Sequence, residues 1–422
     1  MGVTVALIAL ALAVATDAAY LIPFMWHGPN NQINTIKETL ALAKVLGRTT
    51  VLPDLQSHMF TDKSKNSMRF KDLFDLPYIK EHADVILLEE LEAKLGGSAW
   101  DRTLDAVLYM VPPSPMKRQV SLITDQGFRP PADKAAFIDS PVTSWTGCSE
   151  EQVAQLKKLL EPHSVVGVQT FHGLIYGSHW LAGPLATSCT DACCQSFKDR
   201  APAVRKASWI YALADAFIHD RLGGKPFVAA HVRPYPDPCV RIWTQEDTPK
   251  RTENINEWCN NEYLIDRFAP SIKHLLQQYG VDTLFIMTHP RVRTVVEGIL
   301  HQAGLQPVFM EMADVNPELA GIQLSTNLTF SLLAMVEEAV CAKSKAFVGT
   351  KESSMTGTII QDRLGHGVPP EDSYSFFRRE GFEAKPVTVP DWYRLSNYST
   401  TGSTKWRQSL TKYGIKFDEE PA

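Results

Sequence analysis

A histidine and an arginine at the end of an apolar run are the residues best suited to chemistry in this chain. Residues 227–233 read FVAAHVR, and Pro234 follows directly. His231 and Arg233 stand two positions apart, so in a strand both side chains leave the same face. In an open α/β sheet, ligands bind outside the carboxyl ends of the strands, and the guanidinium of Arg233 there suits a phosphate. A structural ion pair at a strand end explains the same pattern.

Two further loops combine polar side chains with an expected helix start. Residues 27–31 read HGPNN, and residues 347–357 read FVGTKESSMTG. The N–H groups and the positive dipole end of a helix N-terminus attract anions. Each loop alone is also explained by a turn with an ordinary Asn or Ser cap. Three such loops, spread over both halves of the chain, favour a shared anion site.

The elements that must position these loops alternate between strand and helix. Apolar runs and helical periodicity predict strands at 20–26, 49–53, 106–111, 165–168, 227–233, 283–287, 307–310 and 346–349. They predict helices over 32–46, 86–95, 204–220, 264–279, 292–303 and 330–342, and one that begins near Ser354. Strands that alternate with helices are typical of doubly wound parallel sheets.

The length of 422 residues favours two domains. We expect an N-terminal Rossmann-like domain over residues 20–222 and a C-terminal one over 223–385, with a cleft between them. The segment 386–422 is expected to pack back on the N-terminal domain. Hydrophobic residues make up 44% of the chain, which is enough for sizeable cores.

The charge pattern and the missing motifs exclude several functions. The net charge is −5 and no Lys/Arg-rich run occurs, so nucleic acid is not an expected partner. The sequence has no GxGxxG fingerprint, no phosphate loop and no GxSxG elbow. It also has no Asp-x-Asp triplet, so we expect no metal, and Arg233 with helix termini must supply the positive field for an anion.

The N-terminus predicts entry into the secretory pathway. Residues 1–15 are apolar but short for a membrane span, and small residues follow up to Ala19, which indicates a signal peptide over 1–19. An uncleaved signal anchor is the alternative, and no other segment is expected to span a membrane. Seven cysteines are present, and a Cys239–Cys259 disulfide would close a polar insert. Asn327 and Asn397 begin glycosylation sequons.

The three loops, in this order, resemble the motifs of a known family. Residues 27–32 (HGPNNQ) with 43–53, the His231/Arg233 pair, and 347–349 followed by a Ser-Ser pair resemble GDP-fucose protein O-fucosyltransferases over roughly residues 20–365. The resemblance implies a GT-B fold, in which two Rossmann-like domains face each other across a cleft that holds GDP-fucose. It also implies an inverting transfer of fucose to a Ser/Thr hydroxyl, with no cofactor beyond the donor substrate.

The same resemblance implies roles for individual residues. Arg233 would stabilise the β-phosphate of the departing GDP, and His231 would contact the nucleotide. Glu337 would accept hydrogen bonds from guanine, and His27 stands where some members have a catalytic glutamate. The other implied contacts, to the phosphates, the nucleoside or fucose, come from Gly28, Asn30 or Asn31, Ser353, Ser354 and Met355.

The resemblance does not identify the acceptor substrate. The Pro-rich turn at 234–238 departs from the family pattern on the acceptor side. The acceptor surface is formed by loops, and the sequence does not identify it, so a glycan acceptor is an alternative. A secreted GDP-sugar-binding protein without turnover is another. The chain ends without an ER-retrieval signal, so the ER lumen, the Golgi lumen and secretion are all expected possibilities.

Overall fold

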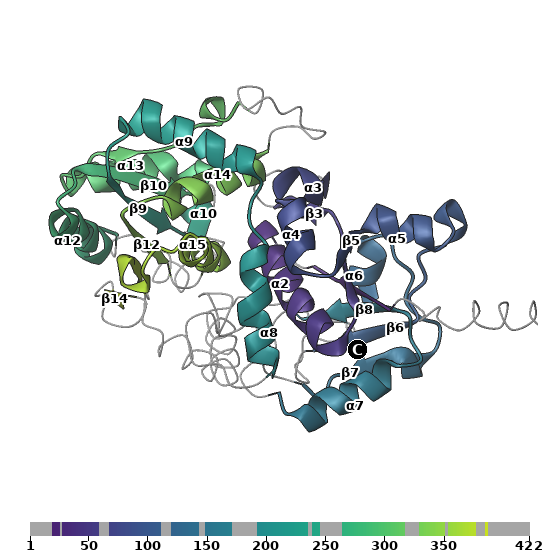
Figure 1. Cartoon of the computed structure of the whole chain (residues 1–422). Helices are drawn as coiled ribbons and strands as arrows, with labels where there is room; N and C mark the ends of the chain where they lie inside the picture. The colour runs from purple at the N-terminus through teal and green to yellow at the C-terminus, as the bar shows by residue number, and fades with distance from the viewer. Residues whose placement is uncertain are drawn as a thin grey trace, which may run out of the picture.

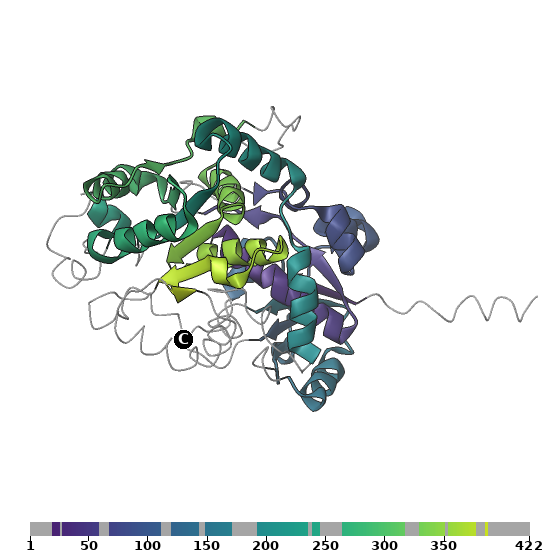
Figure 2. The same cartoon turned by 60° about the vertical axis from the view of Figure 1, so that its left-hand side comes forward.

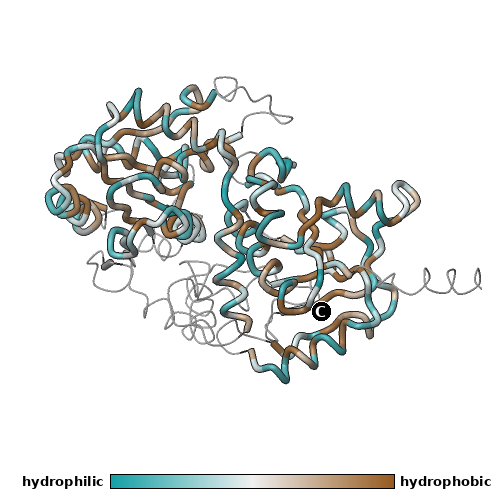
Figure 3. Tube along the Cα trace, in the orientation of Figure 1, coloured by the Kyte–Doolittle hydropathy of each residue, from teal (hydrophilic) through white to brown (hydrophobic). Residues whose placement is uncertain are grey.

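The computed structural model describes residues 19–25, 28–58, 67–110, 120–142, 148–170, 192–234, 239–244, 264–316, 329–350, 353–376 and 385–386. In this part of the chain two six-stranded sheets, each flanked by helices, lie side by side (Figures 1 and 2). Their strands are largely buried, and hydrophobic residues occur along the trace of both halves (Figure 3).

The first sheet is parallel throughout its described pairs. Its strand order is β5 (Val85–Leu87), β2 (Thr49–Leu52), β1 (Tyr20–Pro23), β8 (Val165–Gln169), β6 (Ala106–Tyr109) and β7 (Phe137–Asp139). Gly167 in β8 is packed against Phe24, because a Cβ there would lie 2.1 Å from the ring. Strand β8, the last of this sheet in sequence, thus lies beside β1, the first, at the centre of the sheet.

The second sheet has the doubly wound order that the alternating pattern predicts. It runs β11 (Pro307–Val308), β10 (Thr283–Thr288), β9 (Phe227–Val232), β12 (Ala346–Thr350), β13 (Ser373–Phe376) and β14 (Lys385–Pro386). All pairs are parallel except β13 with β14. The order reverses between β9 and β12, which is where ligands bind in sheets of this type. A two-stranded sheet of β3 (Leu55–Gln56) and β4 (Ser67–Met68) follows β2.

Helix α2 (Pro29–Leu46) links the two halves of the molecule. It begins after Gly28 and ends at Gly47, whose φ of 72° is the left-handed cap that glycine adopts readily. Its apolar side packs on the first sheet, and its polar residues are buried as well because α8 (Ala192–Arg200) and, from the second half, α15 (Ser354–Gly365) both lie against it. The other helices of the first half are α3 (Phe70–Leu73), α4 (Leu76–His82), α5 (Leu88–Lys94), α6 (Val120–Asp125), α7 (Glu150–Leu160) and α8 (Ala192–Arg200).

Helix α9 (Ser208–Leu222) packs on the other side of the expected domain boundary. The expected boundary after residue 222 places this helix in the N-terminal domain, but it packs against α14 (Phe330–Ala342) on the second sheet. Phe217 of α9 meets Phe285 of β10 edge to face at 5.5 Å. The boundary between the two halves therefore lies before α9, whereas the expected boundary lies after it.

The remaining helices of the second half are α10 (Cys239–Trp243), α12 (Ala269–Tyr279), which extends a π turn at Leu264–Phe268, and α13 (Arg293–Gln302).

Some expectations fall on residues that the structure does not describe. These are the signal peptide up to residue 18, the sequon asparagines Asn327 and Asn397, and the segment 387–422. Among the described residues, no helix has the length and apolarity that a membrane crossing needs.

A disulfide joins Cys148 and Cys193, which the sequence analysis did not pair. Cys239 is also disulfide-bonded. Its expected partner, Cys259, lies outside the described residues, so that pairing stays a prediction.

Candidate functional site

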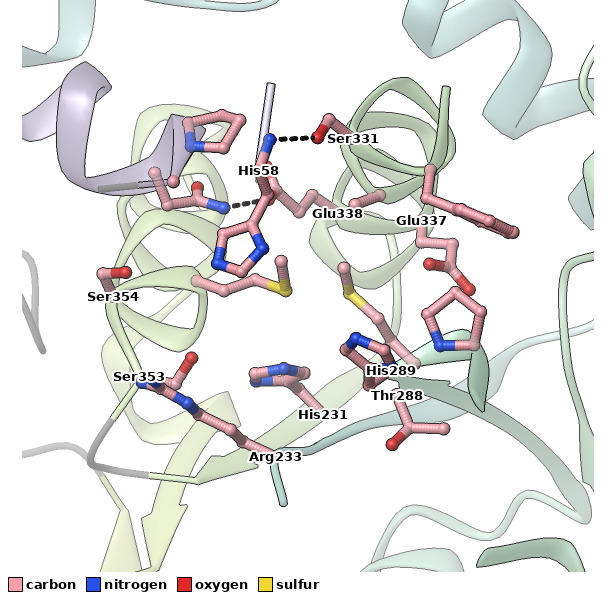
Figure 4. A pocket seen from close by; sticks show the side chains of 18 of the residues that line it. His58, His231, Arg233, Thr288, His289, Ser331, Glu337, Glu338, Ser353 and Ser354 are labelled. Atoms are coloured by element: carbon pink, nitrogen blue, oxygen red, sulfur yellow. Dashed lines mark hydrogen bonds between the residues drawn. The ribbon is translucent and has the colours of Figure 1, made fainter. Parts of the chain in front are cut away.

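A pocket opens between the carboxyl ends of the two sheets (Figure 4). It encloses about 980 Å³ when its open mouth is counted. Every residue that the sequence predicted to act in catalysis or to contact the donor lines it, except His27, which lies outside the described residues. The predicted residues that meet there are Gly28, Asn30, Asn31, His231, Arg233, Glu337, Ser353, Ser354 and Met355. Segments more than 300 positions apart in sequence thus form one site.

The end of strand β9 places His231 and Arg233 at the switch point of the second sheet. Nδ1 of His231 lies 2.8 Å from Oγ1 of Thr356 on α15. Burial, with a smaller effect from Arg233, lowers the pKa of His231 to about 3. His231 is therefore neutral at physiological pH, which suits a positioning contact and makes it a weak proton acceptor.

Hydroxyl groups tie the three neighbouring strand ends together. The main-chain N–H of Arg233 donates to Oγ1 of Thr350 on β12 at 3.1 Å. Oγ1 of Thr288 on β10 donates to the carbonyl of Val232 at 2.7 Å. These bonds fix the backbone from which the Arg233 side chain extends, beside the start of helix α15 at Ser353 and Ser354. A guanidinium next to a helix N-terminus is a site for an anion such as a pyrophosphate.

Glu337 of α14 lies at another end of the pocket in Figure 4, near His289. It is buried, and Nη2 of Arg293 donates to its Oε1 at 2.9 Å. Burial raises the pKa of Glu337 to about 8, against the attraction of Arg293. A carboxyl group placed this way can accept hydrogen bonds from a ligand once it has lost its proton.

Glu338, the next residue, joins the two sheets. Nδ2 of Asn30 on α2 donates to its Oε1 at 2.7 Å, and Nζ of Lys206 lies 3.1 Å from its Oε2. Lys206 also pairs with Asp362 of α15 at 2.5 Å. The side-chain amide of Asn30 is thereby held in place, and both Asn30 and Asn31 line the pocket.

Two histidines of the pocket were missed by the sequence analysis. His289 directly follows β10, which neighbours β9, so the rule for strand ends could have found it. His58 follows the two-residue strand β3, and no pattern in the sequence marks it. Across the described ranges, no group of three or more His, Cys, Asp or Glu side chains is placed to hold a metal ion.

Residues 24–366 match the family model for GDP-fucose protein O-fucosyltransferase. No protein among the curated sequences matches the chain.

Three similar solved structures are forms of POFUT1. A complex with GDP-fucose has a TM-score of 0.53 at 15% identity, covering 88% of this chain and 99% of that one. A second GDP-fucose complex has a TM-score of 0.51 at 16% sequence identity, and the match covers 86% of this chain and 98% of that one. A complex with GDP has a TM-score of 0.52 at 15% identity, and the match covers 86% of this chain and 99% of that one. At these identities the likeness establishes the fold, and it confirms the expected GT-B-like architecture. Because the family model spans most of the sequence, including all three motif loops, the chain belongs to the GDP-fucose protein O-fucosyltransferase family.

Proposed function

We propose that this protein transfers fucose from GDP-fucose to a serine or threonine hydroxyl of a protein acceptor, with inversion at the anomeric carbon and without an essential metal. Membership of the family gives the coarser statement, a fucosyltransferase that uses GDP-fucose. The protein acceptor, the inversion and the roles of single residues belong to the proposal.

The observation that carries the proposal is the position of Arg233. It stands at the switch point of the second sheet, next to the N-terminus of α15, and lines the pocket. Two of the similar structures are POFUT1 in complex with GDP and with GDP-fucose, which supports a nucleotide sugar as the ligand of this pocket. We assign the β-phosphate to Arg233, Ser353 and Ser354, and the guanine to Glu337, with His231 and Met355 between these two ends.

The proposed step forms one bond and breaks another at the anomeric carbon. The acceptor oxygen bonds to that carbon from the face opposite to the phosphate, and the proton of its hydroxyl leaves to a base or to water. The bond from this carbon to the β-phosphate oxygen breaks, and its electron pair leaves with GDP. Negative charge grows on the β-phosphate, where the guanidinium of Arg233 and the N–H groups of α15 stabilise it. Asn30, Asn31 and Gly28 are proposed to contact the donor from the side of the first sheet, and His27 remains a predicted base.

Replacing Arg233 tests this mechanism. Arg233→Ala is expected to slow fucosyl transfer about a hundred- to a thousandfold, on the order of 3–4 kcal/mol, because one preorganised donor to the developing charge is lost. Arg291→Ala is the matched control, since Arg291 is exposed and does not line the pocket. GDP release from GDP-fucose is the measurement. A folded Arg233→Ala protein with near wild-type turnover would contradict the role.

The acceptor needs its own assay. Folded protein domains and free glycans are each incubated with GDP-fucose, and mass spectrometry locates the added fucose. Fucose on serine or threonine is expected. Fucose only on glycans would move the proposal to a glycan acceptor, and GDP binding without release on any acceptor or water would leave a binding protein.

We also propose that the protein works in the secretory pathway, in the ER or Golgi lumen or after secretion. The Cys148–Cys193 disulfide supports an oxidising compartment. Export of a tagged full-length chain, compared with one that lacks residues 1–19, tests this placement. Cytosolic retention of the full-length chain would overturn it.

A further inference from the structure

The two ring nitrogens of His231 have different surroundings. Nδ1 lies 2.8 Å from Oγ1 of Thr356 on α15, whereas no group of the described residues hydrogen-bonds Nε2. His231 lines the pocket, and Figure 4 shows its ring between Arg233 with Ser353 on one side and His289 on the other. A neutral imidazole has one N–H, so the nitrogen that carries it decides whether His231 offers a ligand a donor or an acceptor.

The hydroxyl group of Thr356 decides where this proton lies. Thr356 is fully buried, and buried donors are left unpaired less often than buried acceptors. A threonine inside a helix can donate to the carbonyl four residues earlier, as Thr358 does to Ser354 at 2.9 Å. In the described part of the chain, Thr356 pairs with Nδ1 of His231 instead. Oγ1 therefore donates to Nδ1, and the proton of the neutral ring is on Nε2.

The fold leaves a space for Thr356 beside His231. Gly349 of β12 pairs in register with His231 of β9. A Cβ on Gly349 would lie 2.6 Å from Oγ1 and 2.5 Å from Cγ2 of Thr356, so the threonine fills the space that a side chain there would need. Oγ1 of Thr350 donates to the carbonyl of His231 at 3.2 Å. The ring and the backbone of His231 are thus each held by a threonine.

The ring of His231 stays neutral in this setting. Burial, with a smaller effect from Arg233, lowers the pKa of His231 to about 3. An anionic oxygen attracts an N–H group and repels the lone pair of an unprotonated ring nitrogen. The tautomer with its proton on Nε2 therefore suits a phosphate group that lies beside Arg233 and the start of α15 at Ser353.

We infer that Thr356 is a positioning residue of the donor site, because it fixes the tautomer of His231 whose Nε2–H donates to a phosphate oxygen of the nucleotide. This inference rests on the proposed function above. Thr356 does not itself line the described pocket. It acts through the imidazole ring, and no proton is transferred between the two residues.

Nitrogen NMR of the free protein tests the tautomer directly, because protonated and unprotonated ring nitrogens of a neutral histidine resonate far apart. The protein carries isotope-labelled histidine, and His231→Phe identifies the signals of His231. In wild type, Nε2 is expected to be protonated and Nδ1 to be an unprotonated, hydrogen-bonded acceptor. Thr356→Val is expected to move the Nδ1 signal to that of an acceptor without a hydrogen bond, and Thr356→Ser to leave it in place.

Calorimetry with GDP tests the contact to the ligand. Thr356→Val is expected to weaken GDP binding about tenfold, because the N–H donor is no longer held in place, and Thr356→Ser to stay within about threefold of wild type. Thr358→Val is the matched control, since it removes a buried hydroxyl from the same helix and leaves His231 untouched. In a His231→Phe background, Thr356→Val is expected to add no further loss.

Guanosine, which has no phosphate, separates a phosphate contact from a ribose contact. Thr356→Val is expected to leave the affinity for guanosine unchanged. A loss as large as that for GDP would contradict the phosphate contact.

The inference is also wrong if Nδ1 of His231 carries the proton in wild type, if folded Thr356→Val binds GDP as tightly as wild type, or if its effect and that of His231→Phe simply add. The wild-type spectrum decides the tautomer even if Thr356→Val fails to fold. A wild-type protein that shows the expected tautomer but binds neither GDP nor GDP-fucose would instead remove the proposed function, and the phosphate contact with it.

Discussion

Glu337 and Glu338 are neighbours on helix α14, but their side chains enter different networks. Glu337 points to Arg293 at the pocket, whereas Glu338 joins Asn30 and Lys206 at the contact between the two sheets. Their different partners give them different chemical roles. The first is available to a ligand, and the second belongs to the framework that holds the pocket.

Glu337 leads to a prediction about GDP binding. Its pKa of about 8 means that the carboxyl is largely protonated at pH 7, whereas guanine N–H groups require a carboxylate acceptor. GDP binding at pH 7 is therefore expected to release close to one proton, and the affinity is expected to rise as the pH approaches 8. Calorimetry in two buffers with different ionisation enthalpies measures this release.

Glu337→Gln is the control for that prediction. It is expected to remove the proton release and to weaken GDP binding about ten- to a hundredfold, since bonds to a charged group contribute roughly 1.5–3 kcal/mol. Proton release that persists in Glu337→Gln would show that another group loses the proton.

The sequence could predict the residues of the pocket that follow regular strands. His231, Arg233, Ser353 and Ser354 all stand at carboxyl ends of strands with clear apolar runs. His58 could not be found this way, because β3 has only two residues and the position of its loop depends on bonds to Gln32 and Ser331. Those bonds cross between distant segments and leave no local pattern.

At the scale of elements, α14 and α15 are joined behind the pocket by one buried arginine. Arg363 of α15 is fully buried, and its Nη1 donates to the carbonyl of Ser344, just past the end of α14, at 2.7 Å. Its Nε donates to Oγ of Ser373 on β13 at 2.9 Å. The side chain thus satisfies carbonyl groups that a helix end leaves unpaired and fixes α15, whose N-terminus faces the pocket.

Arg363→Met is expected to lower the free energy of unfolding by about 3–5 kcal/mol, because several buried carbonyls lose their donor at once. Urea denaturation measures this loss. Arg221→Met is the matched control, since Arg221 makes an ion pair with Asp314 at a more exposed position, and its loss is expected to cost less than about 1 kcal/mol. Equal effects of the two substitutions would contradict the structural role of Arg363.

The sequence predicted an element correctly where the length of its apolar run and its apolar content both indicated the same type of element. The strands β1, β2, β8, β9, β10 and β12 lie where they were expected, as does α14. Residues 86–95 were interpreted as one helix, but Val85–Leu87 forms strand β5 and only Leu88–Lys94 is helical. A three-residue apolar strand that runs directly into a helix has the same local pattern as the first turn of that helix.

At the scale of the whole molecule, the two sheets meet through buried polar side chains as well as apolar packing. Asn30 of α2 reaches Glu338, and Lys37 of α2 donates to Oε1 of Gln361 on α15 at 2.5 Å. This explains why α2 is buried on its polar side, which helical periodicity alone assigns to solvent. The pocket lies at the same contact, so bonds that fix one sheet against the other also fix the site.

Two buried lysines at this contact give opposite predictions. Lys206 pairs with two carboxylates, Glu338 and Asp362, whereas Lys37 donates to the neutral Gln361. Lys206→Met leaves two buried carboxylates without a cation and is expected to cost about 3–5 kcal/mol of unfolding free energy at pH 7. Lys37→Met removes a charge that burial disfavours, and it is expected to be neutral or stabilising at the same pH.

The pH dependence separates the two lysines further. Burial lowers the pKa of Lys37 from 10.5 to about 8, so between these values the unfolded chain binds more protons than the folded one. Stability therefore gains a contribution of about 3 kcal/mol as the pH rises from 8 to 10.5. Urea denaturation across this range is expected to show the gain in wild type and its absence in Lys37→Met. A cost of Lys37→Met at pH 7 as large as that of Lys206→Met would mean that the contact depends on both cations equally, against the pairing described here.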